Sequence, residues 1–214
     1  MTATTRSTRP VGRPPDADRQ ERRRGEILDG AVQAFAQHGF ALTDVQEIAD
    51  RLGVGKGTVY RYFPSKEKLF LAAVDHGIRR LKDAVDQAVA ATERPLDRIA
   101  AGIRAYLVFF DENPEVVELL IHERAHFRDR KKPTYFVQRE ANMGPWRELF
   151  QGLVAAGIVR DEPVDQIIEV VSNLVYGTMF TNYFAGRKVT LASQCESILN
   201  VVFHGILVRP EARP

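Results

Sequence analysis

Residues 43–63 read TDVQEIADRLGVGKGTVYRYF, and their spacing is typical of two short helices that cross each other. Thr43 is placed to cap the first helix, and Gln46, three residues on, completes a capping box. Gly53 supplies the left-handed turn that ends this helix and reverses the chain. The apolar side chains spaced to form the seam between the helices are Ile48, Leu52, Val54 and Val59. The stretch therefore predicts a helix-turn-helix over residues 44–63.

The second helix of this motif turns a polar face outward. Val59 and Phe63 are spaced to point inward, and Gly57 lets another backbone come close. The side chains predicted to face outward are Lys56, Thr58, Tyr60 and Arg61. Cations and hydroxyls on a narrow helix suit the phosphates and the major groove of duplex DNA. A helical hairpin with a solvated charged face is the alternative interpretation.

Composition and charge are consistent with a protein that meets an anionic polymer at one end. The chain has 214 residues, of which 44% are hydrophobic and 27% are charged, as in globular proteins. Residues 1–70 hold 12 Lys and Arg against nine Asp and Glu, whereas the remaining 144 residues hold 18 against 19. No apolar run reaches the ~20 residues of a membrane span, and no secretory signal is evident. We therefore expect a cytoplasmic protein.

The rest of the chain keeps a helical period, which predicts an all-α fold. Residues 1–18 have the composition of a flexible basic arm, and the segment Phe127 to Pro133 is expected to be a loop. One helix is expected to run through Met143 to Gly157 with a kink at Gly144-Pro145, and two more over about 164–185 and 191–207. The single cysteine, Cys195, excludes an internal disulfide framework and is interpreted as a buried small apolar residue. We expect no cofactor.

These motifs together resemble the tetracycline-repressor (TetR/AcrR) family of transcriptional regulators. The resemblance covers roughly residues 22–82 and is carried by the following positions: Ile27, Ala31, Phe35, Gly39-Phe40, Thr43, Ile48-Ala49, Leu52-Gly53-Val54, Lys56 to Phe63, Ser65-Lys66-Glu67 and Leu69. It implies a three-helix DNA-binding domain over 19–82 and a helical effector-binding and dimerisation domain over 83–214. It also implies a homodimeric, ligand-responsive transcription factor, usually a repressor.

The resemblance assigns roles to particular residues. Thr43 and Lys66 match positions that contact DNA phosphates, and the residues that match the groove-facing set are Lys56, Gly57, Thr58, Tyr60 and Tyr62. Arg61 matches no fixed position of the family pattern, and we interpret it as a reader of a base. Within the arm, residues 9–14 (RPVGRP) with Arg13 are either a hook in the minor groove or a solvated tail.

The last two helices and several helices before them suggest two further sites. Residues 164–207 are apolar nearly all round their helices, which predicts a homodimer interface. Between residues 99 and 184, apolar stripes carry isolated polar residues that predict a small-molecule cavity. Its expected lining is Tyr106, Phe110, His122, Met143, Trp146, Asn173, Tyr176 and Phe180. The absence of a charged cluster among them favours a hydrophobic or aromatic effector. The alternative is a closed core in which these polar groups satisfy one another.

One motif points to a different class of protein. Residues 122–126 read HERAH, an HExxH pattern that on a helix places two imidazoles one turn apart beside a glutamate. A zinc hydrolase would need a third ligand, for which Glu140 and Glu148 are the candidates. Polar residues at the rim of a core helix or of an effector pocket give the same pattern. A constitutive DNA-binding protein without an effector is the third possibility.

Overall fold

A computed structural model of the chain describes residues 17–206, which form ten α-helices with no β-strand among them. Their bounds are α1 Ala17–Leu42, α2 Val45–Arg51, α3 Lys56–Tyr62, α4 Lys66–Ala90, α5 Pro95–Glu112, α6 Pro114–His126, α7 Thr134–Ala141, α8 Gly144–Ala155, α9 Val164–Ala185 and α10 Leu191–Ile206. The predicted all-α class is confirmed for this part of the chain. The arm with Arg13, and Leu207 at the end of the expected interface, lie outside the described residues.

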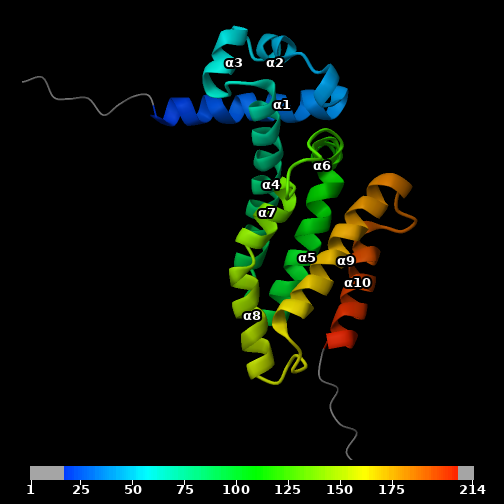
Figure 1. Cartoon of the computed structure of the whole chain (residues 1–214). Coiled ribbons are helices and arrows are strands. Elements are labelled where there is room, and N and C mark those ends of the chain that lie inside the picture. The colour runs from blue at the N-terminus through cyan, green and yellow to red at the C-terminus, as the bar shows by residue number, and fades with distance from the viewer. Residues whose placement is uncertain (1–16, 207–214) are drawn as a thin grey trace, which may run out of the picture.

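Helices α1, α2 and α3 form a small head at one end of the molecule, and α1 lies across the top of the remaining helices (Figure 1). Its core is apolar because each helix turns one face inward. Phe35 of α1 and Phe70 of α4 meet edge to face with ring centroids 5.1 Å apart, and both are fully buried. Burial of a side chain of this size contributes about 1.5–3 kcal/mol, so this contact holds α1 against the first half of α4, within a core that continues into the body.

Helix α4 belongs to both the head and the body. Ser65 caps its first turn by accepting a hydrogen bond from the backbone N–H of Lys68. Its first half packs against α1, and its second half runs down beside α5 (Figure 1). The expected division between residues 82 and 83 falls within this helix. One continuous helix therefore joins the head to the body.

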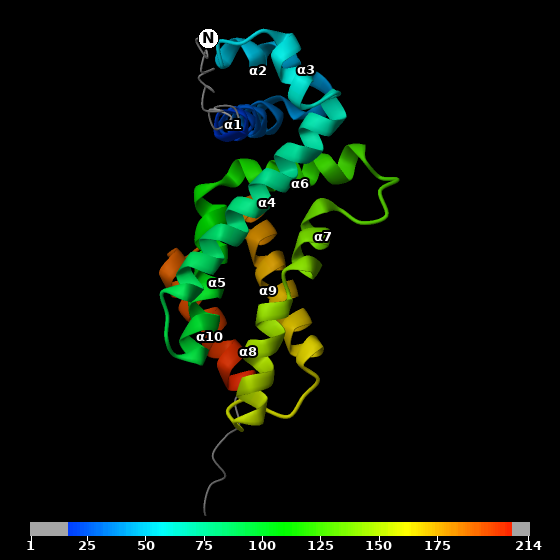
Figure 2. The same ribbon diagram turned by 90° about the vertical axis from the view of Figure 1, so that its left-hand side faces the viewer.

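The body consists of α4 to α10, and α6 crosses beneath the head (Figure 2). Gly39 has a φ of +72°, which bends α1 where the helix was expected to stop, and the chain continues helically to Leu42. The imidazole of His122 on α6 packs at this bend, since a Cβ on Gly39 would lie 2.9 Å from its Cε1. A glycine at this position therefore allows both the positive φ of the bend and the close approach of α6.

Two local expectations were wrong. Thr43 does not cap α2, because the cap is Asp44, whose carboxylate accepts from the N–H of Gln46. The kink expected at Gly144-Pro145 is a break between two helices, with Met143 at the N-cap of α8. Helix α7, over residues 134–141, was not foreseen. Its first N–H is bonded by Glu123 of α6, an interaction between distant residues that a local pattern does not show.

None of the described helices is long and apolar enough to span a membrane.

Candidate DNA-binding and effector sites

Helix α3 presents the outward face that the sequence predicted. Val59 and Phe63 are buried against the head, whereas Tyr60 and Arg61 are exposed. The guanidinium of Arg61 lies over the ring of Tyr62, 5.5 Å from its centroid. The remaining predicted contacts on this face are Lys56 and Thr58, both half-buried, and Gly57, which is exposed. No atom lies within 4 Å of a Cβ placed on Gly57, so the internal packing of the head does not require a glycine there.

An ion pair ties the start of α3 to the start of α2. The ammonium of Lys56 donates to the Asp44 carboxylate at 2.8 Å. The hydrogen bond from the Gln46 N–H and then the bond from Lys56 lower the pKa of Asp44, and the bond to Asp44 raises the pKa of Lys56. Asp44 therefore both caps α2 and holds the first cation of the outward face.

The two residues assigned to phosphate contacts, Lys66 and Thr43, differ in how far their polar groups are used inside the head. Lys66 donates to the carbonyl of Ala41 at 2.9 Å and lies over the ring of Phe40, so its ammonium is held at the junction of α1 and α4. Thr43 is 2% exposed, and its hydroxyl faces the carbonyl oxygen of Gly39 at 2.6 Å. Because this hydroxyl is used inside the head, Thr43 does not enter the interface that we propose below.

Replacing Lys66 by alanine should weaken binding to all duplexes by a similar factor, because a phosphate contact carries no sequence information. We expect the slope of log K against log salt to fall by roughly 0.9 for each head bound. Fluorescence anisotropy of labelled duplexes over a salt series measures this slope. The Lys188→Ala variant, which removes a cation between α9 and α10, is the control. A slope unchanged in the Lys66 variant would exclude the contact.

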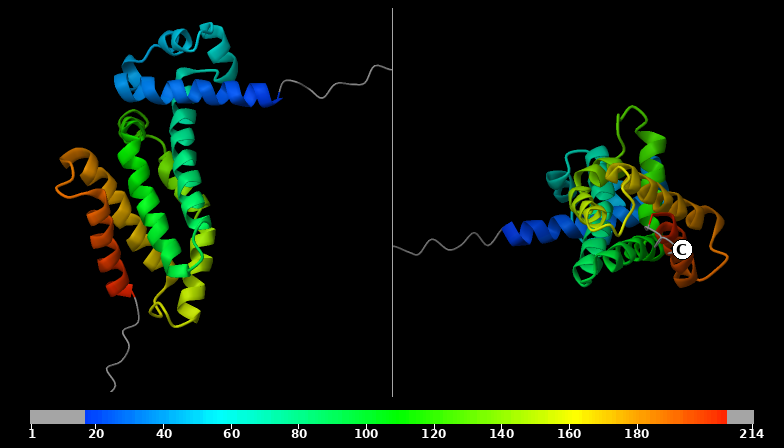
Figure 3. Two further views of the ribbon diagram at one scale, coloured as in Figure 1. Left: turned by 180° about the vertical axis from the view of Figure 1, so that it is seen from behind. Right: turned by 90° about the horizontal axis from the view of Figure 1, so that it is seen from below.

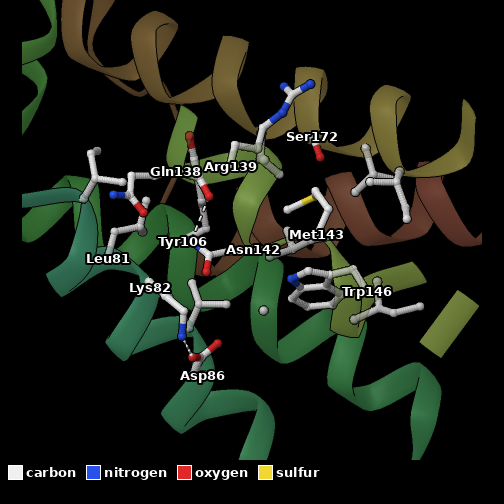
Figure 4. A pocket seen from close by; sticks show the side chains of 18 of the residues that line it. Leu81, Lys82, Asp86, Tyr106, Gln138, Arg139, Asn142, Met143, Trp146 and Ser172 are labelled. Atoms are coloured by element: carbon white, nitrogen blue, oxygen red, sulfur yellow. Dashed lines mark hydrogen bonds and ion pairs between the residues drawn. The ribbon is translucent and has the colours of Figure 1, made fainter. Parts of the chain in front are cut away.

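A cavity of about 160 Å³ lies between α4, α5, α7, α8 and α9 (Figure 4). Its walls are mainly apolar, with a few polar groups contributed by α4, α5, α7 and α9 and by Asn142. The lining residues are Ile78, Leu81, Lys82, Val85, Asp86, Ile99, Gly102, Ile103, Tyr106, Tyr135, Gln138, Arg139, Asn142, Met143, Trp146, Phe150, Ile168, Val171, Ser172 and Val175. An apolar lining with few polar groups is the usual composition of a small-molecule site, although this volume lies below the usual range of ~300–1,000 Å³.

The ring of Trp146 occupies one end of this cavity. A Cβ on Gly102 would lie 2.5 Å from the ring, so the missing side chain on α5 allows the indole to lie against that helix. Tyr106 lies one helical turn further along α5, and its phenol hydroxyl is 2.9 Å from that of Tyr135 on α7. Burial is the main cause that raises the pKa of Tyr106 and raises the pKa of Tyr135 to about 12. Both phenols are therefore protonated at neutral pH.

The structure brings three of the eight expected effector residues to this cavity: Tyr106, Met143 and Trp146. Phe110 borders a separate hollow near Met179, and His122 packs against α1. The expected residues on α9 lie elsewhere: Asn173 accepts a hydrogen bond from Arg139, while the rings of Tyr176 and Phe180 pack edge to face. The structure does not bring these five residues to this cavity; on α9, the face towards it carries Ile168, Val171, Ser172 and Val175 instead.

The wall formed by α4 was missed, although its signal was present. Ile78, Leu81, Lys82 and Val85 recur at helical spacing, as core residues also do. The ammonium of Lys82 pairs with the carboxylate of Asp86 at the edge of the cavity (Figure 4). On α7, Gln138 lines the cavity and donates to Asp75 of α4. The cavity is thus bounded by the same helix that enters the head.

The HExxH pattern is used for packing. Glu123 is 2% exposed, and its carboxylate accepts from the N–H and the hydroxyl of Thr134 and pairs with Arg130 at 2.9 Å. His126 packs beside Phe40 of the head, with ring centroids 5.5 Å apart. Among residues 17–206 no three His, Cys, Asp or Glu side chains are grouped as a metal site requires. The glutamate that a hydrolase would use as a base instead caps α7 and holds the preceding loop.

Comparison with known proteins agrees with this arrangement. The family model described as "Bacterial regulatory proteins, tetR family" matches residues 27–73, which include α2, α3 and the start of α4. These residues place the head of the chain in the tetR family of bacterial regulatory proteins. The matched range contains every residue of the outward face of α3.

Relatives of this tetR-family chain align over different extents. The transcriptional activator FasR of Mycolicibacterium smegmatis is 32% identical over 47% of this chain and 46% of its own length, so this chain spans about half of that relative. The transcriptional repressor KstR2 of Mycobacterium tuberculosis is 26% identical over 86% of this chain and 92% of its own. A solved regulator from Mesorhizobium loti has the same fold with a TM-score of 0.73 at 20% identity, covering 89% of this chain and 99% of that one.

Proposed function

We propose that this tetR-family protein is a homodimeric repressor that binds a palindromic operator and is released from it by an apolar small molecule. The observation that carries this proposal is the double role of α4. Leu81 and Val85 of this helix line the cavity, and its N-terminus, capped by Ser65, follows directly after α3. A molecule in the cavity therefore contacts the helix that holds the DNA-reading head.

The DNA interface that we propose is the outward face of α3 with the start of α4. It comprises Lys56, Gly57, Thr58, Tyr60, Arg61, Tyr62 and Lys66. A helix of this kind enters the major groove, where Arg61 is placed to read a base edge and the cations contact phosphates. Because Lys56 is already paired with Asp44, binding of DNA would exchange one anionic partner of this lysine for another.

The homodimer would form through α9 and α10. The two helices lie together at one flank of the body (Figure 3), and the side-chain amides of Asn182 and Gln194 tie them through two hydrogen bonds of 2.8 Å. Their outer faces expose Val170, Leu174, Phe184 and Val201, of which Phe184 and Val201 are each 68% exposed. A second copy related by twofold symmetry would bury this apolar face and present two heads to a palindromic site.

Regulation would follow from a difference in affinity. A ligand shifts a conformational equilibrium only when it binds one arrangement more tightly than the other. Gln138 lines the cavity and is hydrogen-bonded to Asp75 on α4, so a ligand that displaces this side chain alters a contact between α7 and α4. In the arrangement of the two subunits that the effector prefers, the two heads would no longer match the two halves of the operator.

Replacing Trp146 by alanine should reduce the response to the effector while leaving operator affinity without ligand nearly unchanged, because Trp146 belongs to α8, which lies at the end of the molecule away from α3 (Figure 1). Operator affinity is measured with and without a panel of apolar small molecules, for the native chain and for the variant. We expect at least one molecule to release the native chain and to act at least about tenfold more weakly on the variant. If no molecule changes operator affinity, the protein is a constitutive DNA-binding protein instead.

A further inference from the structure

The end of the cavity nearer the head is closed by two phenols. Along α5 the lining residues run from Ile99 to Tyr106 as this helix rises towards the head (Figure 1). Tyr106 meets Tyr135 of α7 there, with 2.9 Å between their hydroxyl oxygens, and each side chain is at most 9% exposed. Trp146 lies apart from Tyr106, with Asn142 and Met143 between them (Figure 4). The cavity therefore has a hydrogen-bonding end and an apolar end.

The two hydroxyls carry one more hydrogen than their mutual bond uses. One O–H donates to the other oxygen, which leaves a second O–H to find an acceptor. Among the described residues, the other contact of either hydroxyl is with the thioether sulfur of Met179, 4.0 Å from the Tyr106 oxygen. A thioether is a weak acceptor, and a buried donor without a good partner costs free energy. A better acceptor in the cavity would satisfy this O–H.

The surroundings favour a neutral acceptor over an anion. Both phenols keep their protons at neutral pH, so they act as donors. The cations at the rim already have partners: Arg139 donates to Asn173 and stacks on Phe136, and Lys82 pairs with Asp86. To be neutralised, a carboxylate or phosphate held between the phenols and the apolar walls would have to draw Arg139 away from Asn173 and Phe136, which makes its burial more costly than that of a neutral acceptor.

We propose that the effector is an apolar molecule with a ketone or ester carbonyl, whose oxygen accepts a hydrogen bond from the Tyr106–Tyr135 pair while its hydrocarbon part extends towards Trp146. This inference rests on the proposed function, because it takes the cavity to be the effector site. A carbonyl bound at this point would contact α5 through Tyr106 and α7 through Tyr135. Because Gln138 of α7 is hydrogen-bonded to Asp75, the same contact is linked to α4.

Two matched probes test the hydrogen bond. 4-Phenylbutan-2-one and butylbenzene have the same carbon skeleton and differ only in a carbonyl in place of a methylene. Trp146 is the one tryptophan of the chain and lines the cavity, so its fluorescence reports binding of either probe to the full-length protein. The test variant is Tyr106→Phe with Tyr135→Phe, which removes both hydroxyls and leaves no half-satisfied group. The control is Tyr176→Phe, which removes the hydroxyl of a ring that packs against Tyr135 but does not line the cavity.

We expect the double variant to bind the ketone about tenfold more weakly than the native chain does and to bind butylbenzene within about twofold of it. The control variant should bind both probes as the native chain does. Equal losses for the two probes in the double variant would show that the phenols only shape the cavity, and equal affinities in native chain and double variant would show that they make no bond. Either result overturns the proposal, as does failure of both probes to bind the native chain.

Two further measurements distinguish loss of the fold, failure of the proposed ligand site and failure of the proposed function. Thermal unfolding of the double variant checks its fold, and Tyr135→Phe alone repeats the comparison if the double variant is unfolded. Operator affinity is measured in the same samples. A ketone that binds through the phenols without changing operator affinity would support the site and contradict the proposed function, whereas operator release that does not depend on the phenols would contradict the site alone.

Discussion

Replacing Val170 and Val201 together by aspartate should convert the protein to monomers and weaken its binding to a palindromic operator by at least about a hundredfold. Val170 is 61% exposed and Val201 is 68% exposed, on neighbouring helices of the same flank. Carboxylates at these positions cannot be buried in an apolar interface without a large cost. With the dimer lost, the second head no longer binds as part of the same molecule, and the gain from linking two reading heads disappears.

Sedimentation at micromolar concentration and anisotropy on a labelled duplex measure the two consequences. Val137→Asp places the same charge on an exposed valine of α7, outside the proposed interface, and should remain dimeric with native affinity. If the double variant stays dimeric and keeps its operator affinity, the interface lies elsewhere on the molecule.

Replacing Glu123 by alanine should lower the free energy of unfolding by about 3 kcal/mol. The change removes the acceptor for the N–H and hydroxyl of Thr134 and leaves Arg130 without its partner. Thr134 begins α7, which carries Tyr135, Gln138 and Arg139 of the cavity lining. We therefore expect urea unfolding to show a loss of stability and limited proteolysis to cut first between α6 and α7.

The same variant separates the structural role of Glu123 from a catalytic one. Glu148→Ala removes an exposed carboxylate that was a candidate third zinc ligand and should change stability by less than about 0.5 kcal/mol. A general base on a bound metal would show the opposite pattern, in which Glu123→Ala keeps native stability and loses hydrolysis of a peptide in the presence of zinc. Such a result would restore the hydrolase interpretation.

The head could be predicted from sequence because its signals are local. Gly53 has the positive φ, +63°, that the turn between α2 and α3 requires, and Val59 and Phe63 are buried as their spacing indicated. The one error within the motif is also local. Thr43 and Asp44 are both good capping residues, and the choice between them depends on Thr43 reaching carbonyl groups of α1, which sequence spacing does not specify.

The cavity could be predicted only in part because it is made by packing between distant helices. Trp146 lines it because Gly102 on another helix leaves room for the indole. Tyr176 is a tyrosine on an apolar helix, as Tyr135 is, and sequence alone does not distinguish them. The structure places Tyr176 next to the face of α9 that lines the cavity, where it packs against aromatic rings. A rotation of one residue along a helix, about 100°, decides between the two outcomes, and periodicity alone does not fix it.

Selection of duplexes from a random pool by the full-length protein tests the central claim most directly. A homodimeric regulator that reads DNA through two copies of α3 should enrich sequences with two inverted half-sites at one fixed spacing. Deleting one half-site should then lower affinity at least about a hundredfold. Enrichment of a single half-site without symmetry, or no enrichment above the starting pool, would contradict it.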